Sequence, residues 1–394
     1  MKFLNKLKYQ KKIQPFDFLY YYVPVVILVL LGIADTLYLS ISHYRVYADI
    51  GYKSFCAVSR AINCDTVSQS PYSIFLQIPL PIWGIIGYTF VLILLGLAGT
   101  KHANKKRLWG ILFWILLIFS VHSVILAAIS SFIIHSYCLM CIASYLINFA
   151  LLYYFWFINR RFGDTGLIRG LVPDLKFLID KKHFMLPICF VYLAVIISLL
   201  AAMPRYWELD PPKLSQSINK GITSDGHPWI GADDPELVIV EYTDYLCFQC
   251  RKFHFYLREL IQDNPEKIRL VHRHFPLDHK FNPIVRKKFH GGSGKLALFT
   301  IYAQAQGKFW EANDLFFKLN PKIKIVKLKP LAESLGLNYK DMSRAQYDAQ
   351  IQSKLLKDIR AGLELGISGT PAYVIKNELY QGHIPPRILK KALQ

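Results

Sequence analysis

Six of the seven cysteines in this 394-residue chain stand in three close pairs, a pattern that favours dithiol and disulfide chemistry over burial as small apolar side chains. Two of the pairs have two residues between the thiols, so both sulfurs fall within about one turn of a helix. The start of a helix stabilises the thiolate, which is the reactive form of cysteine. The pairs are Cys56 with Cys64, Cys138 with Cys141, and Cys247 with Cys250, while Cys189 stands apart.

Five apolar stretches are long enough to place cysteines at a membrane, since about 20 helical residues span a hydrocarbon core of about 30 Å. The loop between the first two stretches holds Cys56 and Cys64, and the fourth begins with Cys138 and Cys141. Lysine and arginine gather before the first stretch and after the second and fourth, as on the cytoplasmic flanks of membrane helices. We therefore expect a cytoplasmic N-terminus and both thiol pairs on the opposite face. The stretches are residues 22–42, 81–99, 108–134, 138–157 and 184–203.

Charge and composition exclude some classes of protein. A formal net charge of +20 could suggest nucleic acid, but the basic residues lie at the ends of apolar stretches, so we expect no nucleic-acid binding. A hydrophobic content of 53% is too high for one soluble domain, and 394 residues are too many for one small membrane bundle. At least two domains follow, one of them in the lipid bilayer.

The C-terminal region predicts a thioredoxin-like unit outside the membrane. Residues 204–232 are rich in proline, glycine and serine and are interpreted as a tether. A compact apolar strand at 237–242 leads to Cys247 at the start of a helix. Cys247 would attack substrates and Cys250 would resolve the mixed disulfide. A structural disulfide is the alternative, but a bond that closes so short a loop contributes little stability.

Two helical patterns, at 295–317 and 345–365, predict a helical insertion in this unit, and a strand at 372–376 follows Thr370 and Pro371. In a thioredoxin fold these two residues would form a cis-proline that faces the Cys247 pair, where the backbone can bind a peptide as an added strand. An ordinary loop proline is the alternative.

Two sets of motifs carry a resemblance to known families. The first set is Cys56, the sequence Cys64-Asp65-Thr66-Val67 with Ser70 beyond it, and Cys138-Leu139-Met140-Cys141 with Tyr145 beyond it. The second set is the run from Glu241 to Cys247, His274-Phe275-Pro276-Leu277, Gly307-Lys308-Phe309-Trp310 and Gly369-Thr370-Pro371. Residues 15–158 thereby resemble the vitamin K epoxide reductase family, and residues 225–394 resemble a thioredoxin-like domain of the DsbA type. Together they resemble the bacterial fused form.

The first resemblance implies a cofactor. A quinone, ubiquinone or menaquinone, would dock near the membrane end of the Cys138 and Cys141 pair, with Ser70 hydrogen-bonded to its oxygen and Tyr145 lining the pocket. Ser70 precedes a proline and could instead only start a turn, and Tyr145 could serve only in bundle packing. Asp35 in the first span is either functional or hydrogen-bonded between helices, and His122 in the third span carries a weaker signal of the same kind.

The resemblance also implies an order of electron transfer. Reduced cysteines of extracytoplasmic proteins would reduce Cys247 and Cys250, and the electrons would reach the membrane quinone pool through the loop pair and then the pair in the fourth span. The loop pair, Cys56 and Cys64, could instead be a structural staple. A zinc site made of the four membrane-proximal thiols fits the spacings less well, and we expect no metal.

Taken together, the sequence predicts a membrane all-α four-helix bundle with one additional anchor helix, and a C-terminal α/β thioredoxin-like domain with a helical insertion. The predicted function is quinone-dependent disulfide formation at the bacterial inner membrane, with the C-terminal domain in the periplasm. Cys247-Phe248-Gln249-Cys250 departs from the DsbA type, which usually has proline or histidine between the cysteines. A membrane-anchored disulfide reductase or isomerase, or a thiol chaperone or metal-binding module without turnover, therefore remains an alternative. The predicted divisions are residues 1–160, 161–203, 204–232 and 233–394.

Overall fold

The computed structural model describes residues 17–59, 61–98, 107–162, 166–209, 218–287, 289–319 and 327–393. The chain divides into two compact units. One consists of Met1–Tyr44 and Ser54–Pro204 and is helical, and the other consists of Arg45–Lys53 and Arg205–Gln394 and is mixed α/β. The lysines ahead of the first span and those of the loop at 101–106 lie outside the described residues.

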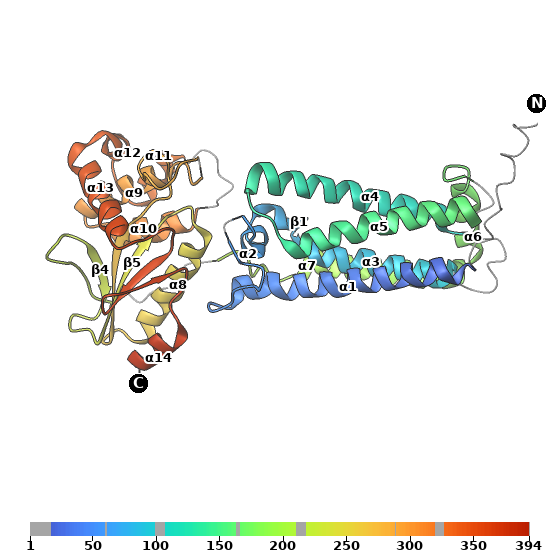
Figure 1. Ribbon diagram of the computed structural model, residues 1–394. Helices are drawn as coiled ribbons and strands as arrows, with labels where there is room; N and C mark the ends of the chain where they lie inside the picture. Colours follow the sequence, from blue (N-terminus) through green and yellow to red (C-terminus); the bar gives the residue numbers. More distant parts are fainter. Residues whose placement is uncertain are drawn as a thin grey trace, which may run out of the picture. The chain divides into compact units, whose positions relative to one another are not determined.

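Within the described ranges, five helices are long and apolar enough to cross a membrane, which confirms the predicted spans. Figure 1 shows them running side by side in the helical unit. The third of them, α4, continues into a π-helical turn, η3, which ends at a left-handed His135. The helices are α1 (Leu19–Ala48), α3 (Leu80–Ala98), α4 (Trp109–Ile129, with η3 at Ser130–Ile134), α5 (Leu139–Phe162) and α7 (Lys182–Ala202).

Four of these helices share one core, and the fifth contributes little to it. Val29 of α1, Val91 of α3, Leu116 of α4 and Phe155 of α5 are fully buried in the same apolar cluster. From α7 only Met185 joins the buried cluster, and most of its large apolar side chains are exposed, as expected for a helix whose faces meet lipid. A short helix, α6 (Leu171–Asp180), lies between α5 and α7 in the chain. The predicted four-helix bundle with an additional helix is confirmed.

The loop between α1 and α3 contains several short helices and strands. This loop contains α2 (Cys64–Ser68), a 3₁₀ turn η2 (Pro71–Ser73), and a short hairpin of β1 (Ile74–Phe75) and β2 (Ile78–Pro79). Because α2 begins at Cys64 and η2 follows Ser70, the two turns decide where these side chains lie.

The α/β unit contains a six-stranded sheet in the order β3-β4-β6-β5-β7-β8. Its centre is a parallel pair, β5 (Leu237–Thr243) and β6 (Ile268–His274), joined through α8 (Phe248–Asp263). The other four strands pair with their neighbours in antiparallel fashion: β3 (Lys220–Ile222), β4 (Pro228–Gly231), β7 (Ala372–Ile375) and β8 (Glu378–Gln381). This is the predicted thioredoxin-like arrangement.

A helical insertion separates β6 from β7, as predicted, and the last helix closes the unit. The insertion contains α9 (Ser293–Ala305), α10 (Phe309–Phe317), α11 (Leu328–Ser334), α12 (Tyr339–Arg344), the 3₁₀ turn η4 (Ala345–Tyr347) and α13 (Ala349–Glu364), and the last helix is α14 (Pro386–Leu393). Figure 1 shows α9, α12 and α13 on one side of the sheet and α8 and α14 on the other.

Alternation along β5 supplies both faces of the sheet. Leu237 and Ile239 belong to the core that contains α8 residues, whereas Tyr242 belongs to the core that contains α9 and α13 residues. Successive side chains of a strand point to opposite faces, so one strand serves two apolar layers. Glu241 has the same parity as Ile239, and it is accordingly buried toward α8.

The predicted tether is partly wrong, because β3 and β4 lie within residues 204–232 and extend the sheet. Proline can begin a strand, and Pro228 does so here. Gly221 has no side chain, which leaves room for the indole of Trp229 on the paired strand. The helical pattern at 295–317 is also two helices, because Gly307 adopts a left-handed φ of +71° between α9 and α10.

Candidate active site

The start of α2 holds Cys64 next to the segment that precedes α5. Asn63 caps α2, since its side-chain oxygen accepts a hydrogen bond from Thr66 N at 3.1 Å. Its backbone N–H donates to Tyr137 O at 2.9 Å, and Tyr137 N donates to Ala61 O at 2.8 Å. These bonds tie residues 61–63 to the residue before Cys138, so two distant parts of the sequence bring their cysteines together.

Cys56 and Cys64 form a disulfide, with 5.7 Å between their Cα atoms. Asp65 on α2 accepts hydrogen bonds from Ser54 N, which holds the Cys56 side of the loop against the helix. Both sulfurs are buried in a small cluster with Leu39 and Cys138. The loop disulfide therefore packs against the first thiol of the next pair.

Cys138 and Cys141 lie at the start of α5 as free thiols. Cys138 directly precedes the helix, and its sulfur accepts a hydrogen bond from Cys141 N at 3.2 Å. The free N–H groups of a helix start stabilise a thiolate in this position. Cys138 is buried beside the disulfide, whereas Cys141 lines a cavity inside the bundle. The two thiols thus face two different environments.

The cavity has a volume of about 500 Å³ and lies among residues of α1, α3, α4, α5 and the loop that holds α2. Most of its lining is apolar, including Leu39, Phe119 and Leu126. Ser70 and Tyr145, which the sequence analysis connected with a quinone, line it together with Cys141. The structure therefore brings these three predicted residues around one apolar space.

Several polar side chains of the cavity were missed by the sequence analysis. His43 Nε2 lies 3.2 Å from Ser73 Oγ, and both residues line the cavity. Tyr88 donates to Asn148 Oδ1 at 2.7 Å, and Asn148 in turn donates to Ser123 Oγ at 3.0 Å. The only available signal was the presence of single polar residues within apolar helices.

Three residues whose roles were left open can now be placed. Ser70 Oγ donates a hydrogen bond to Val67 O at 2.7 Å, as expected if Ser70 starts a turn. Its side chain also lines the cavity, as expected for a residue that contacts a quinone. Asp35 accepts a hydrogen bond from Ser144 of α5, which connects two helices, and its Oδ1 has no partner among the described residues. His122 lines the cavity.

In the α/β unit, Cys247 directly precedes α8 at its N-cap position, and Cys250 occupies the first turn of the helix. Cys247 Sγ lies 3.4 Å from Thr370 O, and the bond between Thr370 and Pro371 is cis, as predicted. Cys250 is fully buried, and its sulfur accepts a hydrogen bond from Asp244 N at 3.5 Å, whereas Cys247 remains 9% exposed. Substrate can therefore reach Cys247 more easily than Cys250.

The two thiols differ in their acidity. A hydrogen bond with Cys250 lowers the pKa of Cys247 to about 7, although burial opposes this shift. Burial, together with the neighbouring Cys247, raises the pKa of Cys250 well above its ordinary value. At neutral pH Cys247 is therefore about half thiolate, whereas Cys250 stays protonated, and Cys247 is the better leaving group of the pair.

A buried charged cluster lies one helical turn beyond Cys250. Glu241 contacts His272 Nδ1 at 2.8 Å and His254 Nδ1 at 3.4 Å, and His254 Nε2 lies 3.1 Å from Asp314. Burial alone would raise the pKa of Glu241, but the charge of His254, with hydrogen bonds from both imidazoles, lowers it to about 2. The sequence analysis quoted Glu241 within a motif but did not anticipate its histidine partners.

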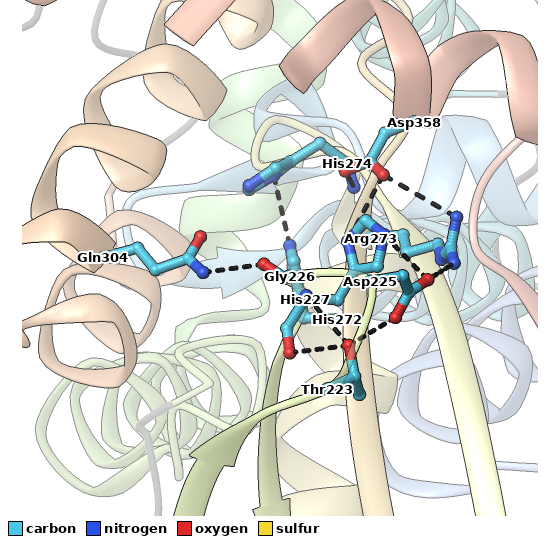
Figure 2. A network of polar contacts seen from close by, with 9 residues as sticks. All are labelled: Thr223, Asp225, Gly226, His227, His272, Arg273, His274, Gln304 and Asp358. Carbon is cyan, nitrogen blue, oxygen red and sulfur yellow. Dashed lines mark hydrogen bonds and ion pairs between the residues drawn. The ribbon is translucent and has the colours of Figure 1, made fainter. Parts of the chain in front are cut away.

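Figure 2 shows a polar network that includes His272 of this cluster together with His274, Asp358, His227 and Asp225. His272 Nε2 lies 3.2 Å from His274 Nδ1, and His274 N donates to Asp358 at 3.0 Å. Asp358 of α13 also contacts His227 Nδ1 at 3.4 Å, and the exposed Asp225 contacts His227 Nε2 at 3.3 Å. The network joins β6, α13 and the turn between β3 and β4. It therefore holds in place the two strands that the sequence analysis had assigned to a tether.

Comparisons with known families agree with this architecture. Residues 23–156 match the Vitamin K epoxide reductase family, and residues 238–394 match the DSBA-like thioredoxin domain. The chain therefore carries a membrane domain of the vitamin K epoxide reductase family followed by a DsbA-like thioredoxin domain, and these two domains support thiol–disulfide oxidoreductase activity.

Individual relatives are distant. The Na(+)/H(+) antiporter NhaA 3 of Salinispora tropica is 26% identical over 152 residues, which are 39% of this chain and 22% of the antiporter. The Na(+)/H(+) antiporter NhaA 1 of Salinispora arenicola is 25% identical over 154 residues, again 39% of this chain and 22% of the relative. The chain thus spans about a fifth of the length of these curated relatives.

Two solved structures are similar to the C-terminal part of the fold in the length that they cover. A thioredoxin-like oxidoreductase from Silicibacter pomeroyi is 23% identical, with a TM-score of 0.36 over 42% of this chain and 90% of its own. The thiol-disulfide exchange protein alpha-DsbA2 from Wolbachia pipientis is 17% identical, with a TM-score of 0.34 over 42% of this chain and 84% of its own.

Proposed function

We propose that this protein is a quinone-dependent thiol–disulfide oxidoreductase that forms disulfides in extracytoplasmic proteins. The observation that carries the proposal is the placement of the α5 dithiol: Cys138 packs against the Cys56–Cys64 disulfide, and Cys141 lines the apolar cavity. This arrangement connects a disulfide that can receive electrons from protein thiols with a space suited to a lipid-soluble acceptor.

Each transfer is a thiol–disulfide exchange in which one dithiol is oxidised and one disulfide is reduced. A substrate thiolate attacks Cys247 in its disulfide with Cys250, and Cys250 leaves and takes a proton. The second substrate thiolate then displaces Cys247, so the substrate gains a disulfide and the domain holds two thiols. Thr370 and Pro371 next to Cys247 would bind the substrate backbone at this point.

The electrons then pass to the membrane domain. The reduced thioredoxin-like domain attacks Cys56, which frees Cys64, and the domain leaves oxidised. Cys64 and Cys56 regain their disulfide by passing two electrons to Cys138 and Cys141. The buried cluster that contains Cys56, Cys64 and Cys138 supports exchange between the loop pair and the α5 pair.

The cavity fits a quinone. Ligand pockets have volumes of about 300–1,000 Å³ and are mostly apolar with a few polar groups, and this cavity of about 500 Å³ has that character. Tyr145 and Ser70 would bind and orient the ring system, and the His43–Ser73 pair offers a further polar contact. A bound quinone, ubiquinone or menaquinone, supplies the acceptor for two electrons and two protons. Cys141 would face it, while the apolar lining excludes water.

The location that goes with this function is the bacterial inner membrane. Five membrane helices, with lysine and arginine after the second and fourth, support a cytoplasmic N-terminus and an extracytoplasmic α/β domain. On this view residues 1–160 form the reductase-like bundle, 161–203 the cytoplasmic segment and fifth helix, and the thioredoxin-like domain follows. Its partners would be extracytoplasmic proteins with reduced cysteines and the membrane quinone pool.

A direct assay separates this function from its alternatives. Purified full-length protein is mixed with a reduced dithiol peptide and a quinone, and quinone absorbance and peptide oxidation are followed together. Equal molar loss of quinone and of peptide dithiol is expected, and Cys141→Ser should abolish both. Cys189→Ser is the matched control, because Cys189 is an exposed free thiol of α7 and should leave the rate unchanged. Peptide reshuffling without quinone loss would instead indicate a reductase or isomerase, and peptide binding without turnover would indicate a chaperone.

A further inference from the structure

An unassigned histidine lies beside the Cys247 motif. His290 belongs to the loop between β6 and α9, far from the motif in sequence, and its Nδ1 lies 3.1 Å from the Asp244 carboxylate. Asp244 is fully buried and directly precedes the cysteine loop, and its carbonyl accepts from Cys247 N at 3.1 Å. The histidine and the nucleophile thus share one anchoring residue.

The position of His290 is built by several contacts. Its backbone N–H donates to Leu277 O at 3.2 Å, and Leu277 N donates to the Asp244 carboxylate at 2.6 Å. The ring of Phe289 stacks on the imidazole with 4.1 Å between centroids. The imidazole is 19% exposed, so it borders both the buried carboxylate and solvent. An ion pair held in this way keeps its geometry without depending on a mobile surface side chain.

We propose that His290, positioned by Asp244, supplies the positive charge that stabilises the Cys247 thiolate. DsbA-type domains often have a histidine between the two cysteines, whereas this chain has Phe248 and Gln249 there. The charge comes instead from the loop ahead of α9. This inference rests on the proposed disulfide exchange at Cys247.

The electrostatics of the site agree with this role. The hydrogen bond with Cys250 and the charge of His290 both lower the pKa of the Cys247 thiol, whereas burial and the charge of Asp244 raise it. Burial would lower the pKa of His290, but Asp244, Cys247 and Asp278 together raise it, so the imidazolium persists to higher pH. The phenol of Tyr373 on β7 lies within the electrostatic reach of both thiols and of the Glu241 carboxylate on β5.

The stabilised thiolate matters in the second exchange step. When the second substrate thiolate attacks the mixed disulfide, the bond between the substrate sulfur and Cys247 breaks and Cys247 leaves with the electron pair. A thiol of lower pKa leaves faster, so His290 promotes release of the oxidised substrate. It also favours the reduced form of the domain, which makes its disulfide a stronger oxidant.

The test is the pH dependence of Cys247 alkylation in the full-length protein, resolved by mass spectrometry of peptides. In the reduced wild type the alkylation midpoint should lie near pH 7, the value set by the Cys247 pKa. His290→Gln should move it upward by about one unit, which lowers the rate at pH 6 about tenfold. His279→Gln is the matched control, because His279 stands in the same loop, paired with Asp278 at 3.3 Å, and should leave the midpoint unchanged.

A second measurement uses the wild type and does not depend on the variant folding. Diethyl pyrocarbonate modifies neutral imidazole, so its pH profile at His290 reports the charge of that ring. Because the interaction is reciprocal, the His290 midpoint should fall when Cys247 is oxidised to the disulfide. Equal midpoints in the two redox states, or a Cys247 midpoint unchanged by His290→Gln, would overturn the inference. Quinone reduction by the wild type is measured separately. Absence of quinone reduction would contradict the proposed function, whereas unchanged midpoints would contradict the role of His290.

Discussion

The cap at Asn63 gives a quantitative test of how the membrane domain aligns its cysteines. Asn63→Ala removes the side-chain acceptor for Thr66 N but keeps the backbone bond to Tyr137. Losing an N-cap of this kind costs about 1 kcal/mol, which is about a fivefold change in the population of the capped helix. Because α2 has only five residues and starts with Cys64, its fraying should displace that sulfur from Cys138.

The assay measures the disulfide that the alignment makes possible. In full-length protein with alanine at Cys56 and Cys141, the equilibrium constant for a Cys64–Cys138 bond is measured against glutathione and resolved by mass spectrometry of peptides. This constant reports the effective concentration of one thiol at the other. Asn63→Ala should lower it about fivefold, whereas Asn63→Asp, an equally good cap, should leave it within about twofold. Equal constants for the alanine and aspartate variants would show that the cap does not position Cys64.

Three further predictions concern packing, pH and topology. A Cβ at Gly84 of α3 would lie 2.5 Å from Thr36 Cγ2 of α1. Gly84→Ala should therefore lower the free energy of unfolding of the bundle in micelles by about 1–3 kcal/mol and slow quinone reduction. Gly96→Ala is the control, because no atom lies within 4 Å of the added Cβ, and it should have neither effect. Burial raises the pKa of Asp358 from 3.8 to about 7, so the folded state retains a proton that the unfolded chain loses. The resulting stabilisation is complete below about pH 4 and disappears as the pH rises past about 7. Hydrogen exchange at β6 should report this pH dependence as a change on the order of a few kcal/mol in the free energy of unfolding, and Asp358→Asn should remove it. An unchanged slope would contradict that assignment. Alkaline phosphatase fused after Leu209 should be active, and an inactive fusion beside an active cytoplasmic reporter would reverse the topology.

The sequence predicted the parts of the fold that depend on long or strongly patterned segments. Five apolar stretches became five helices, because a run of about 20 apolar residues has few alternatives to a membrane span. The strand, Cys-x-x-Cys and helix order around Cys247 likewise led to the correct fold class. In contrast, β3 and β4 have only three and four residues. Their pairing with each other places Gly221 opposite Trp229, and the sequence analysis assigned both residues to a tether on composition alone.

The site was predictable where chemistry marks a residue type and less so where tertiary contacts create the function. The paired cysteines stand out in the sequence, and family motifs led to Ser70 and Tyr145, which line one cavity with Cys141. His43 and His290 carry no local signal, because each acquires its partner from a distant segment. Ser73 is 30 positions from His43, and Asp244 is 46 positions from His290.

The central claim is that electrons pass between the two domains through the loop disulfide. The double variant Cys64→Ala with Cys250→Ala tests it most directly, since it removes the two thiols that would resolve a bond between Cys56 and Cys247. Mild oxidation of the full-length protein, followed by mass spectrometry of non-reduced peptides, should reveal a Cys56–Cys247 disulfide, and adding Cys56→Ala should abolish it. Cys247 joined to Cys138, or no bond between the domains under the same oxidation, would contradict the relay and leave the Cys56–Cys64 bond a structural staple.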